Sequence, residues 1–230
     1  MIEKERIGLY IHSLDSDLPE TLRIIEKEAL ADEVPIIKKS TQGLLRFLVR
    51  SKKPMHILEV GCAVGFSALL MCEYMPKNGH ITTIEKVPQR IQKAKENFSF
   101  AKKDSQITLL TGDATDILKE LVTQKKEYDM IFMDAAKGQY LNFFEDIHKL
   151  LSLDGLLVSD NVLQDGDIVE SRYAIEKRNR TIHRRMRDYL YLLTHHEELD
   201  TVILPMGDGI TLSTRIYKEQ PNHEKGIEKS

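Results

Sequence analysis

The sequence predicts an α/β fold in which a doubly wound, mostly parallel sheet is covered by helices. Between residues 56 and 161, short apolar segments alternate with longer amphipathic segments. Each amphipathic segment is long enough to form the right-handed crossover between two parallel strands. Each apolar segment also ends in a polar or small residue, at the place where open parallel sheets bind their ligands. The 230 residues fit one domain better than two.

The first 53 residues are expected to form helices. In segments 16–31 and 36–50 apolar residues recur at helical spacing, namely Leu18, Leu22, Ile25, Leu30, Ile37, Leu44, Leu45 and Leu48. We expect residues 1–53 to form an N-terminal helical cap over the sheet.

The strands and helices of the sheet follow in order. Strands are predicted at 56–61, 80–85, 107–112, 128–134 and 155–161, and helices at about 66–75, 88–101, 114–124, 140–151 and 168–196. The segments TVILPM and ITLSTRI, on either side of Gly207, Asp208 and Gly209, are typical of a closing antiparallel pair. Seven strands are therefore expected, in one domain over 1–217, with a polar tail over 218–230.

Composition excludes several classes of protein. No apolar run approaches the roughly 20 residues of a membrane-spanning helix, and the N-terminus is too charged for a signal peptide. We expect a cytoplasmic protein with no membrane partner. Cys62 and Cys72 are too few for a disulfide framework. The net charge of −3 means that a polyanion would have to bind at a local basic patch.

Three strand ends carry residues suited to an adenosine-containing cofactor. The first runs into a glycine turn, Glu59-Val-Gly61-Cys-Ala-Val-Gly65-Phe-Ser67, where a ligand can approach the backbone. The second ends in Glu85, a carboxylate placed to accept hydrogen bonds from both ribose hydroxyls. The third ends in Asp113 and Ala114, beside the expected adenine, although Asp113 alone is also a common helix N-cap. The GxxxG spacing favours S-adenosylmethionine over a nicotinamide cofactor.

The next two strand ends carry a second set of polar residues. Asp134 ends one strand and Asp160 and Asn161 end its expected neighbour. Their oxygens form a set suited to a hard divalent cation such as magnesium, the alternative being helix capping and turn formation. Lys137 would bring an amine to the same place, where it could accept a proton, unless it is an ordinary surface lysine.

With these residues in view, the chain resembles the magnesium-dependent O-methyltransferases that include the catechol and caffeoyl-CoA enzymes. The likeness covers about residues 30 to 216 and rests on ILEVGCAVGFSALLM, the acid of TTIE, GDA, FMDAAKGQY, the pair DN and LPMGDGITLSTR. It implies a class I methyltransferase domain with a Rossmann-like sheet, commonly dimeric. It also implies that Asp134, Asp160 and Asn161 bind Mg²⁺ and that Lys137 is the general base. Cofactor contacts would come from Ile37, Gly61, Ser67, Glu85, Asp113, Ala114 and Asp134.

Within that family, the whole-length pattern is most similar to the bacterial enzymes that methylate 5-hydroxyuridine to 5-methoxyuridine at the wobble position of tRNA. The catechol enzymes place tryptophans around the substrate ring, and this chain has none. Independently, seven basic residues and one acid lie between Arg172 and Arg187. On a helix Arg180, Arg184 and Arg187 would share one face, opposite an apolar face traced by Ile175, Ile182, Met186 and Leu193. This basic face could bind the phosphates of a tRNA anticodon loop.

Other functions remain open at this point. The basic stretch is also compatible with a solvated helix or with the phosphates of coenzyme A, so the substrate could be a small catechol-like or CoA-linked phenol. A fold does not prove activity, and a non-catalytic RNA-binding protein with a methyltransferase fold is a second alternative. For an enzyme, we expect in-line methyl transfer from S-adenosylmethionine to a hydroxyl oxygen.

Overall fold

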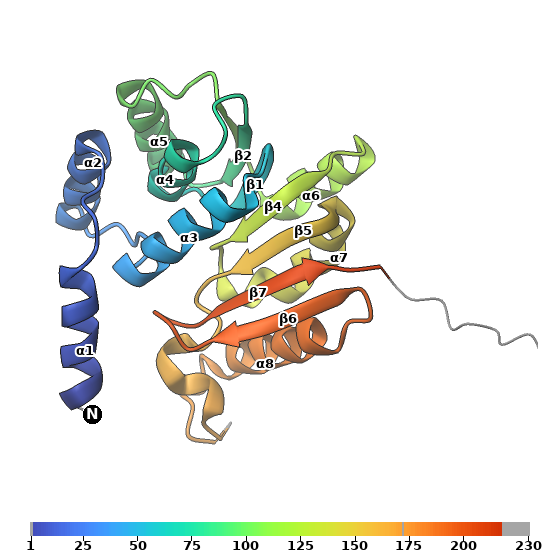
Figure 1. Cartoon of the computed structure of the whole chain (residues 1–230). Helices are drawn as coiled ribbons and strands as arrows, with labels where there is room; N and C mark the ends of the chain where they lie inside the picture. Colours follow the sequence, from blue (N-terminus) through green and yellow to red (C-terminus); the bar gives the residue numbers. More distant parts are fainter. Residues whose placement is uncertain (1, 172, 218–230) are drawn as a thin grey trace, which may run out of the picture.

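The structure is a computed structural model that describes residues 2–171 and 173–217 (Figure 1). Arg172 and the predicted polar tail 218–230 lie outside the described residues. The helices are α1 (Ile2–Ser13), α2 (Glu20–Ala31), α3 (Lys39–Lys52), α4 (Phe66–Tyr74), α5 (Pro88–Phe100), α6 (Ala114–Thr123), α7 (Tyr140–Leu150) and α8 (Arg180–His195), with 3-10 turns η1 (Lys137–Gln139) and η2 (Gln164–Val169). The strands are β1 (His56–Val60), β2 (His80–Glu85), β3 (Ile107–Thr111), β4 (Tyr128–Met133), β5 (Leu151–Ser159), β6 (Leu199–Leu204) and β7 (Ile210–Arg215).

The strands form one seven-stranded sheet in the order β3-β2-β1-β4-β5-β7-β6. Strands β1 to β5 pair in parallel, while β7 pairs antiparallel with β5 and β6. The winding reverses between β1 and β4, which therefore end side by side at the sheet's carboxyl edge. This order confirms the predicted doubly wound sheet with an antiparallel last pair. In such sheets ligands bind at the point of reversal.

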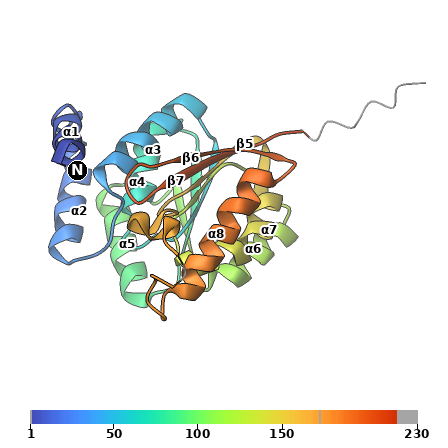
Figure 2. The same cartoon turned by 90° about the horizontal axis from the view of Figure 1, so that it is seen from below.

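Helices cover both faces of the sheet (Figure 2). Alternate residues of each inner strand face opposite sides: Phe132 of β4 packs with helices α2 to α5, while its neighbours Ile131 and Met133 pack with α6, α7 and α8. Because both sides of these strands are buried, they are apolar almost without interruption, as parallel strands require.

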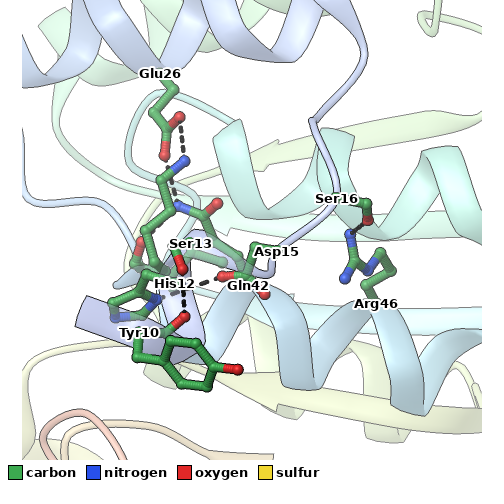
Figure 3. A network of polar contacts seen from close by, with 10 residues as sticks. Tyr10, His12, Ser13, Asp15, Ser16, Glu26, Gln42 and Arg46 are labelled. Carbon is green, nitrogen blue, oxygen red and sulfur yellow. Dashed lines mark hydrogen bonds and ion pairs between the residues drawn. The ribbon is translucent and has the colours of Figure 1, made fainter. Parts of the chain in front are cut away.

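The cap consists of α1, α2 and α3. Leu22, Ile25 and Leu45 are buried against the body of the protein, as their helical spacing predicts, whereas Leu30 is 61% exposed and does not belong to that face. Polar contacts join α2 to α3 and the α1–α2 connection to α3 (Figure 3). The Arg46 guanidinium donates to Ser16 Oγ at 2.5 Å, and Gln42 Nε2 donates to Glu26 Oε1 at 2.7 Å. These contacts tie α2 and the α1–α2 connection to α3.

The predicted helix over 168–196 is wrong in its first part. Helix α8 begins only at Arg180, and the residues before it form η2 and a series of turns. The residues ahead of Arg180 form turns whose hydrogen bonds join residues three apart, Ala174 N to Ser171 O at 2.9 Å and Asn179 N to Glu176 O at 2.8 Å, whereas an α-helix joins residues four apart. Ile175 is buried as a single anchor ahead of the helix, and Ile182 within it is 36% exposed, so these two do not belong to a continuous apolar face.

Candidate active site

A cavity of about 550 Å³ opens at the carboxyl ends of the parallel strands. Its floor comes from the segments that follow β1 to β5, and one wall comes from residues 35–41 of the cap together with the β6–β7 turn. The predicted site residues that line it are Ile37, Gly61, Ser67, Glu85, Asp113, Ala114, Asp134, Asp160 and Asn161. The fold thus brings together side chains that the sequence placed on six separate segments.

Gly61 begins the loop after β1 in a conformation that favours glycine, with φ of 106°. A β-carbon at this position would lie 2.0 Å from the backbone oxygen of Asp134, so any side chain would push apart the ends of β1 and β4. The glycine therefore allows the two central strand ends to approach each other and keeps the cavity floor open.

Glu85 is buried at the end of β2 and is held by backbone amides. Its Oε2 accepts from Ala63 N at 2.8 Å, and its Oε1 accepts from Lys86 N at 2.8 Å and Val87 N at 2.9 Å. These bonds fix the carboxylate against the glycine loop and occupy both lone pairs of Oε1, which leaves one lone pair on Oε2 for a ligand hydroxyl. The arrangement suits the predicted role of accepting from ribose.

Glu59 is fully buried in β1, beneath the same loop. Its carboxyl accepts from Ser67 Oγ at 2.6 Å and from Thr83 Oγ1. Burial raises the pKa of Glu59 to about 7, against which these two hydrogen bonds act only in part. Since the Ser67 hydroxyl donates to Glu59, its oxygen presents a lone pair to a ligand.

Asp113 caps helix α6 and stands at the rim of the cavity. Its side chain accepts from Thr115 N at 3.0 Å, and Lys86 Nζ lies 3.3 Å from its other oxygen. The hydrogen bond from the Thr115 amide, helped by Lys86, lowers the pKa of Asp113, which therefore stays ionised. Asp113 thus both caps helix α6 and lines the cavity, two roles that the sequence had predicted for it.

Asp134 and Asp160 meet where β4 and β5 end, together with Asn161. Asn161 Nδ2 donates to Asp134 Oδ1 at 2.8 Å, and Asn161 N donates to Asp160 Oδ1 at 2.7 Å. Burial and the charge of Asp160 raise the pKa of Asp134 to about 7. Burial also raises the pKa of Asp160 to about 6, with a further contribution from Asp208. The two carboxylates therefore repel each other in a partly dry site.

The backbone around this pair is fixed by Tyr140 of the DAAKGQY segment. Its buried hydroxyl donates to the backbone oxygens of Asp160 at 2.9 Å and Met133 at 3.2 Å, joining the ends of β4 and β5. Asn161 adopts a left-handed conformation, φ 62°, which asparagine tolerates better than most residues. Both features aim the Asn161 amide at Asp134.

The oxygens of Asp134, Asp160 and Asn161 fit the requirements of a hard divalent cation. They are two carboxylates and one carboxamide, and they leave open positions for water or substrate. Among the residues that the structure describes, no three histidine, cysteine or carboxylate side chains gather into a fuller set of metal ligands. The fit therefore depends on the amide as third ligand.

Lys137 begins η1, three residues after Asp134, and is half-buried. It does not belong to the cavity lining, but its ammonium is close enough to Asp134 to act on that carboxyl electrostatically. The structure therefore places Lys137 beside the predicted acidic pair, at the edge of the cavity.

The three predicted RNA-binding arginines do not line the cavity, and they differ from one another. Arg184 and Arg187 are exposed on α8. Arg180 is half-buried, because its guanidinium donates to the backbone oxygens of Ile175 at 3.0 Å and Tyr173 at 3.5 Å. Arg180 thus stabilises the turns ahead of the helix, and the uniform basic face expected from the sequence is reduced to Arg184 and Arg187.

Sequence reasoning gave no role to several cavity residues. Lys38 and Thr41 enter from the cap, and Asp208 enters from the β6–β7 turn. Asp208 belongs to the quoted segment LPMGDGITLSTR, and Lys38 directly follows the VPII segment, so both lay next to recognised signals. Neither signal indicated that the two residues meet.

Similarity to known proteins agrees with this geometry. Residues 12–216 match the O-methyltransferase family. A catechol O-methyltransferase of Niastella koreensis is 33% identical over 169 residues, 72% of this chain and 76% of that protein. A caffeoyl-CoA O-methyltransferase of Stellaria longipes is 28% identical over 227 residues, 94% and 93% of the two chains. The structure of a Podospora anserina methyltransferase bound to S-adenosylhomocysteine superposes with a TM-score of 0.82, 25% identity and coverage of 94% and 96%. The chain belongs to the O-methyltransferase family.

Proposed function

We propose that this chain transfers a methyl group from S-adenosylmethionine to a hydroxyl of a small catechol-like or CoA-linked phenol. The observation that carries the proposal is one cavity with two chemically distinct ends. At one end the Glu85 carboxylate, beside a glycine loop, can accept a hydrogen bond from a ribose hydroxyl. The other end has the oxygens of Asp134, Asp160 and Asn161, with Lys137 nearby. The substrate class is supported by the catechol and caffeoyl-CoA relatives.

The chain's own residues would divide the work between the two ends. Glu85, Ser67 and the glycine loop would hold the cofactor, whose sulfonium supplies the electrophilic methyl group. Asp134, Asp160 and Asn161 would hold Mg²⁺, which when bound polarises a substrate hydroxyl and favours its ionised form. Lys137, as a neutral amine, would accept the hydroxyl proton, become an ammonium and then pass the proton to solvent. The oxygen then attacks the methyl carbon, and the carbon–sulfur bond breaks with its electron pair left on sulfur.

A direct test is methylation of a panel containing catechol, caffeoyl-CoA and tRNA bearing 5-hydroxyuridine. The purified protein is incubated with methyl-labelled S-adenosylmethionine and Mg²⁺, with an EDTA-treated reaction as control, and products are identified by mass spectrometry. Label in either phenol that disappears with EDTA supports the proposal. No label in any substrate, from a protein that binds the cofactor, contradicts it.

The second candidate substrate is 5-hydroxyuridine at the wobble position of tRNA. Its support is the position of α8, which contacts η1, the 3-10 turn that begins at Lys137. Helix α8 also carries the exposed Arg184 and Arg187. A tRNA backbone could contact these arginines while a single-stranded base enters the cavity. The double variant Arg184→Ala/Arg187→Ala should then slow methylation of tRNA about tenfold and leave phenol methylation unchanged. Equal rates on tRNA before and after substitution would remove this candidate.

We also propose that the chain acts as a homodimer through helix α1. Ile7, Leu9, Tyr10, Ile11 and Leu14 are each more than half exposed, although a helix of this length is marginal in water without packing. Light scattering should give twice the chain mass for the wild type and the single-chain mass for Ile7→Glu/Ile11→Glu. A control variant, Tyr191→Glu at an exposed position of α8, should stay dimeric. A monomeric wild type would contradict the proposal.

Among the described residues, no helix combines the length and the apolar character needed to cross a membrane.

A further inference from the structure

The cap meets the β6–β7 turn at the end of the cavity that holds Asp134, Asp160 and Asn161. We call it the acceptor end, because the methyl acceptor would bind there. Lys38, the residue that precedes α3, places its Nζ 2.5 Å from Asp208 Oδ1. The Asp208 side chain is only 14% exposed, whereas that of Lys38 is 56% exposed. Both residues line the cavity, so the ion pair bridges two segments of its wall that lie 170 residues apart in sequence.

The turn that carries Asp208 is fixed to the body of the protein. Leu163 N donates to the Asp208 backbone oxygen at 2.8 Å, and Val162 N donates to the Gly209 oxygen at 3.0 Å. These two donors directly follow Asn161, so hydrogen bonds join the β6–β7 turn to the segment after β5. Asp208 is therefore an immobile anchor, and the cap is the segment that it can hold.

The cap packs closely on the same turn. A β-carbon at Gly207, whose φ is 59°, would lie 3.3 Å from Thr41 Oγ1. Thr41 in turn hydrogen-bonds the Asp160 carboxyl. The start of α3 thus has three contacts with the acceptor end: the ion pair, the glycine packing and this hydrogen bond.

Charge makes the ion pair more than a surface contact. Asp208 acts repulsively on both Asp134 and Asp160, while Lys38 acts attractively on Asp160. Without Lys38, a largely buried carboxylate would face two others with less compensation, and the cap would lose its attraction to the turn. With Lys38 in place, closing the cap reduces the repulsion.

We propose that Lys38 and Asp208 form a clasp that holds cap residues 35–41 over the cavity, and that both are positioning residues for the cofactor. Pro35, Ile36 and Ile37, which precede Lys38, form the cap side of the cavity wall. In this proposal the cofactor leaves when this wall opens, and opening separates the ion pair. The clasp therefore slows cofactor release. This inference rests on the proposed binding of S-adenosylmethionine.

The test is the affinity and dissociation rate of S-adenosylmethionine, measured by calorimetry and by stopped-flow displacement with S-adenosylhomocysteine. Lys38→Met and Asp208→Asn should each weaken binding about tenfold, mainly through faster dissociation. Because the two residues act as a pair, the double variant should be no weaker than either single variant. Lys38→Arg, which keeps the charge, should recover most of the affinity.

The matched control is Lys39→Met. Lys39 is the adjacent lysine, but its Nζ pairs with Glu26 Oε2 at 2.6 Å and it lines a separate, smaller cavity between the cap helices. It should bind the cofactor as the wild type does. In steady state, Lys38→Met should raise KM for S-adenosylmethionine about tenfold with little change in kcat, a separation that a general loss of folding would not produce.

The outcomes separate the clasp from the proposed function. If the wild type binds S-adenosylmethionine and Lys38→Met binds it as tightly as Lys39→Met, the clasp is wrong and the function stands. If Lys38→Met lowers the melting temperature of the free protein and Lys38→Arg does not recover binding, the residue is merely structural and the clasp is again wrong. If the wild type does not bind the cofactor, the proposed function fails and the clasp falls with it.

Discussion

At the cofactor end of the cavity the acidic side chains have their partners within the fold, whereas at the acceptor end they face one another. Glu85 accepts three backbone amides, and Glu59 accepts two hydroxyls. The ionised carboxylates of Asp134 and Asp160, in contrast, repel each other, and Asp208 adds to the repulsion on both. The carboxylates at the cofactor end are therefore held by hydrogen bonds within the protein before a ligand binds. The acceptor end stores electrostatic repulsion that a bound cation would offset.

The comparison predicts that damage at the two ends will appear in different measurements. Changes at Asp134, Asp160, Asn161 or Lys137 should lower turnover and leave cofactor affinity intact, and changes at Glu85 should do the reverse. The Lys38–Asp208 clasp is a separate case, because it acts on cofactor release through the cap. Four substitutions test this separation.

Asp160→Ala should have the largest effect. It removes one of the two carboxylates proposed to hold Mg²⁺, so methyl transfer should fall by about four orders of magnitude and residual activity should no longer respond to Mg²⁺. Affinity for S-adenosylmethionine, measured by calorimetry, should change less than about threefold, because Asp160 lies away from the ribose acceptor. Asp200→Ala, at an exposed position of β6, is the control. A fully active variant that resists EDTA would refute the cation site.

Lys137→Ala should have the next largest effect. Loss of the proton acceptor should lower kcat about a thousandfold with cofactor affinity unchanged. Lys137→Arg should not restore turnover, because a guanidinium stays protonated. The exposed Lys149→Ala on α7 serves as control. Unchanged turnover in single-turnover measurements would exclude Lys137 as the base.

Glu85→Ala should give the opposite pattern. It removes both the ribose acceptor and the anchor of three backbone amides, so binding of S-adenosylmethionine should weaken about a hundredfold. The turnover number at saturating cofactor should change little. The comparison with Glu96→Ala, exposed on α5, controls for loss of charge. If kcat at saturation falls as far as affinity does, the two ends are not functionally separate.

Glu59→Gln should give the smallest effect, visible as a pH dependence of stability. The pKa of Glu59 is raised by burial to about 7 in the folded protein, from an ordinary value near 4.5. The folded state therefore keeps a proton that the unfolded state loses, and the contribution of Glu59 to stability declines as pH rises through this interval. Relative to Glu59→Gln, the free energy of unfolding of the wild type should fall by about 2 kcal/mol between pH 5 and pH 8.

Urea unfolding at several pH values measures this difference. The neutral variant cancels contributions from other acids, such as Asp113, whose lowered pKa acts in the opposite direction. A difference between wild type and variant that stays constant from pH 5 to pH 8 would mean that the Glu59 carboxyl is ionised throughout. The cofactor end would then also store charge repulsion, and the contrast between the two ends would weaken.

Much of the site could be predicted because parallel strands share an edge. A polar residue after each apolar run is a local signal, and the strand order then brings Glu85, Asp134 and Asp160 to one cavity. Helix α8 was harder to predict, because the basic and apolar periodicity continues upstream of Arg180. The backbone there forms turns with hydrogen bonds between residues three apart, and Ile175 is a single buried anchor. The preference for a tRNA substrate remains a prediction.

The sequence by itself determined the alternation of strands and helices, the glycine loop and the residue types at each strand end, because these depend on periodicity and on neighbours along the chain. Tertiary structure alone decided which charges meet. Asp208 pairs with Lys38 across 170 residues, and the Arg180 guanidinium binds the backbone ahead of its own helix. Hydrophobic periodicity fixes which face of an element is buried, but it does not specify which polar groups on two distant elements come into contact.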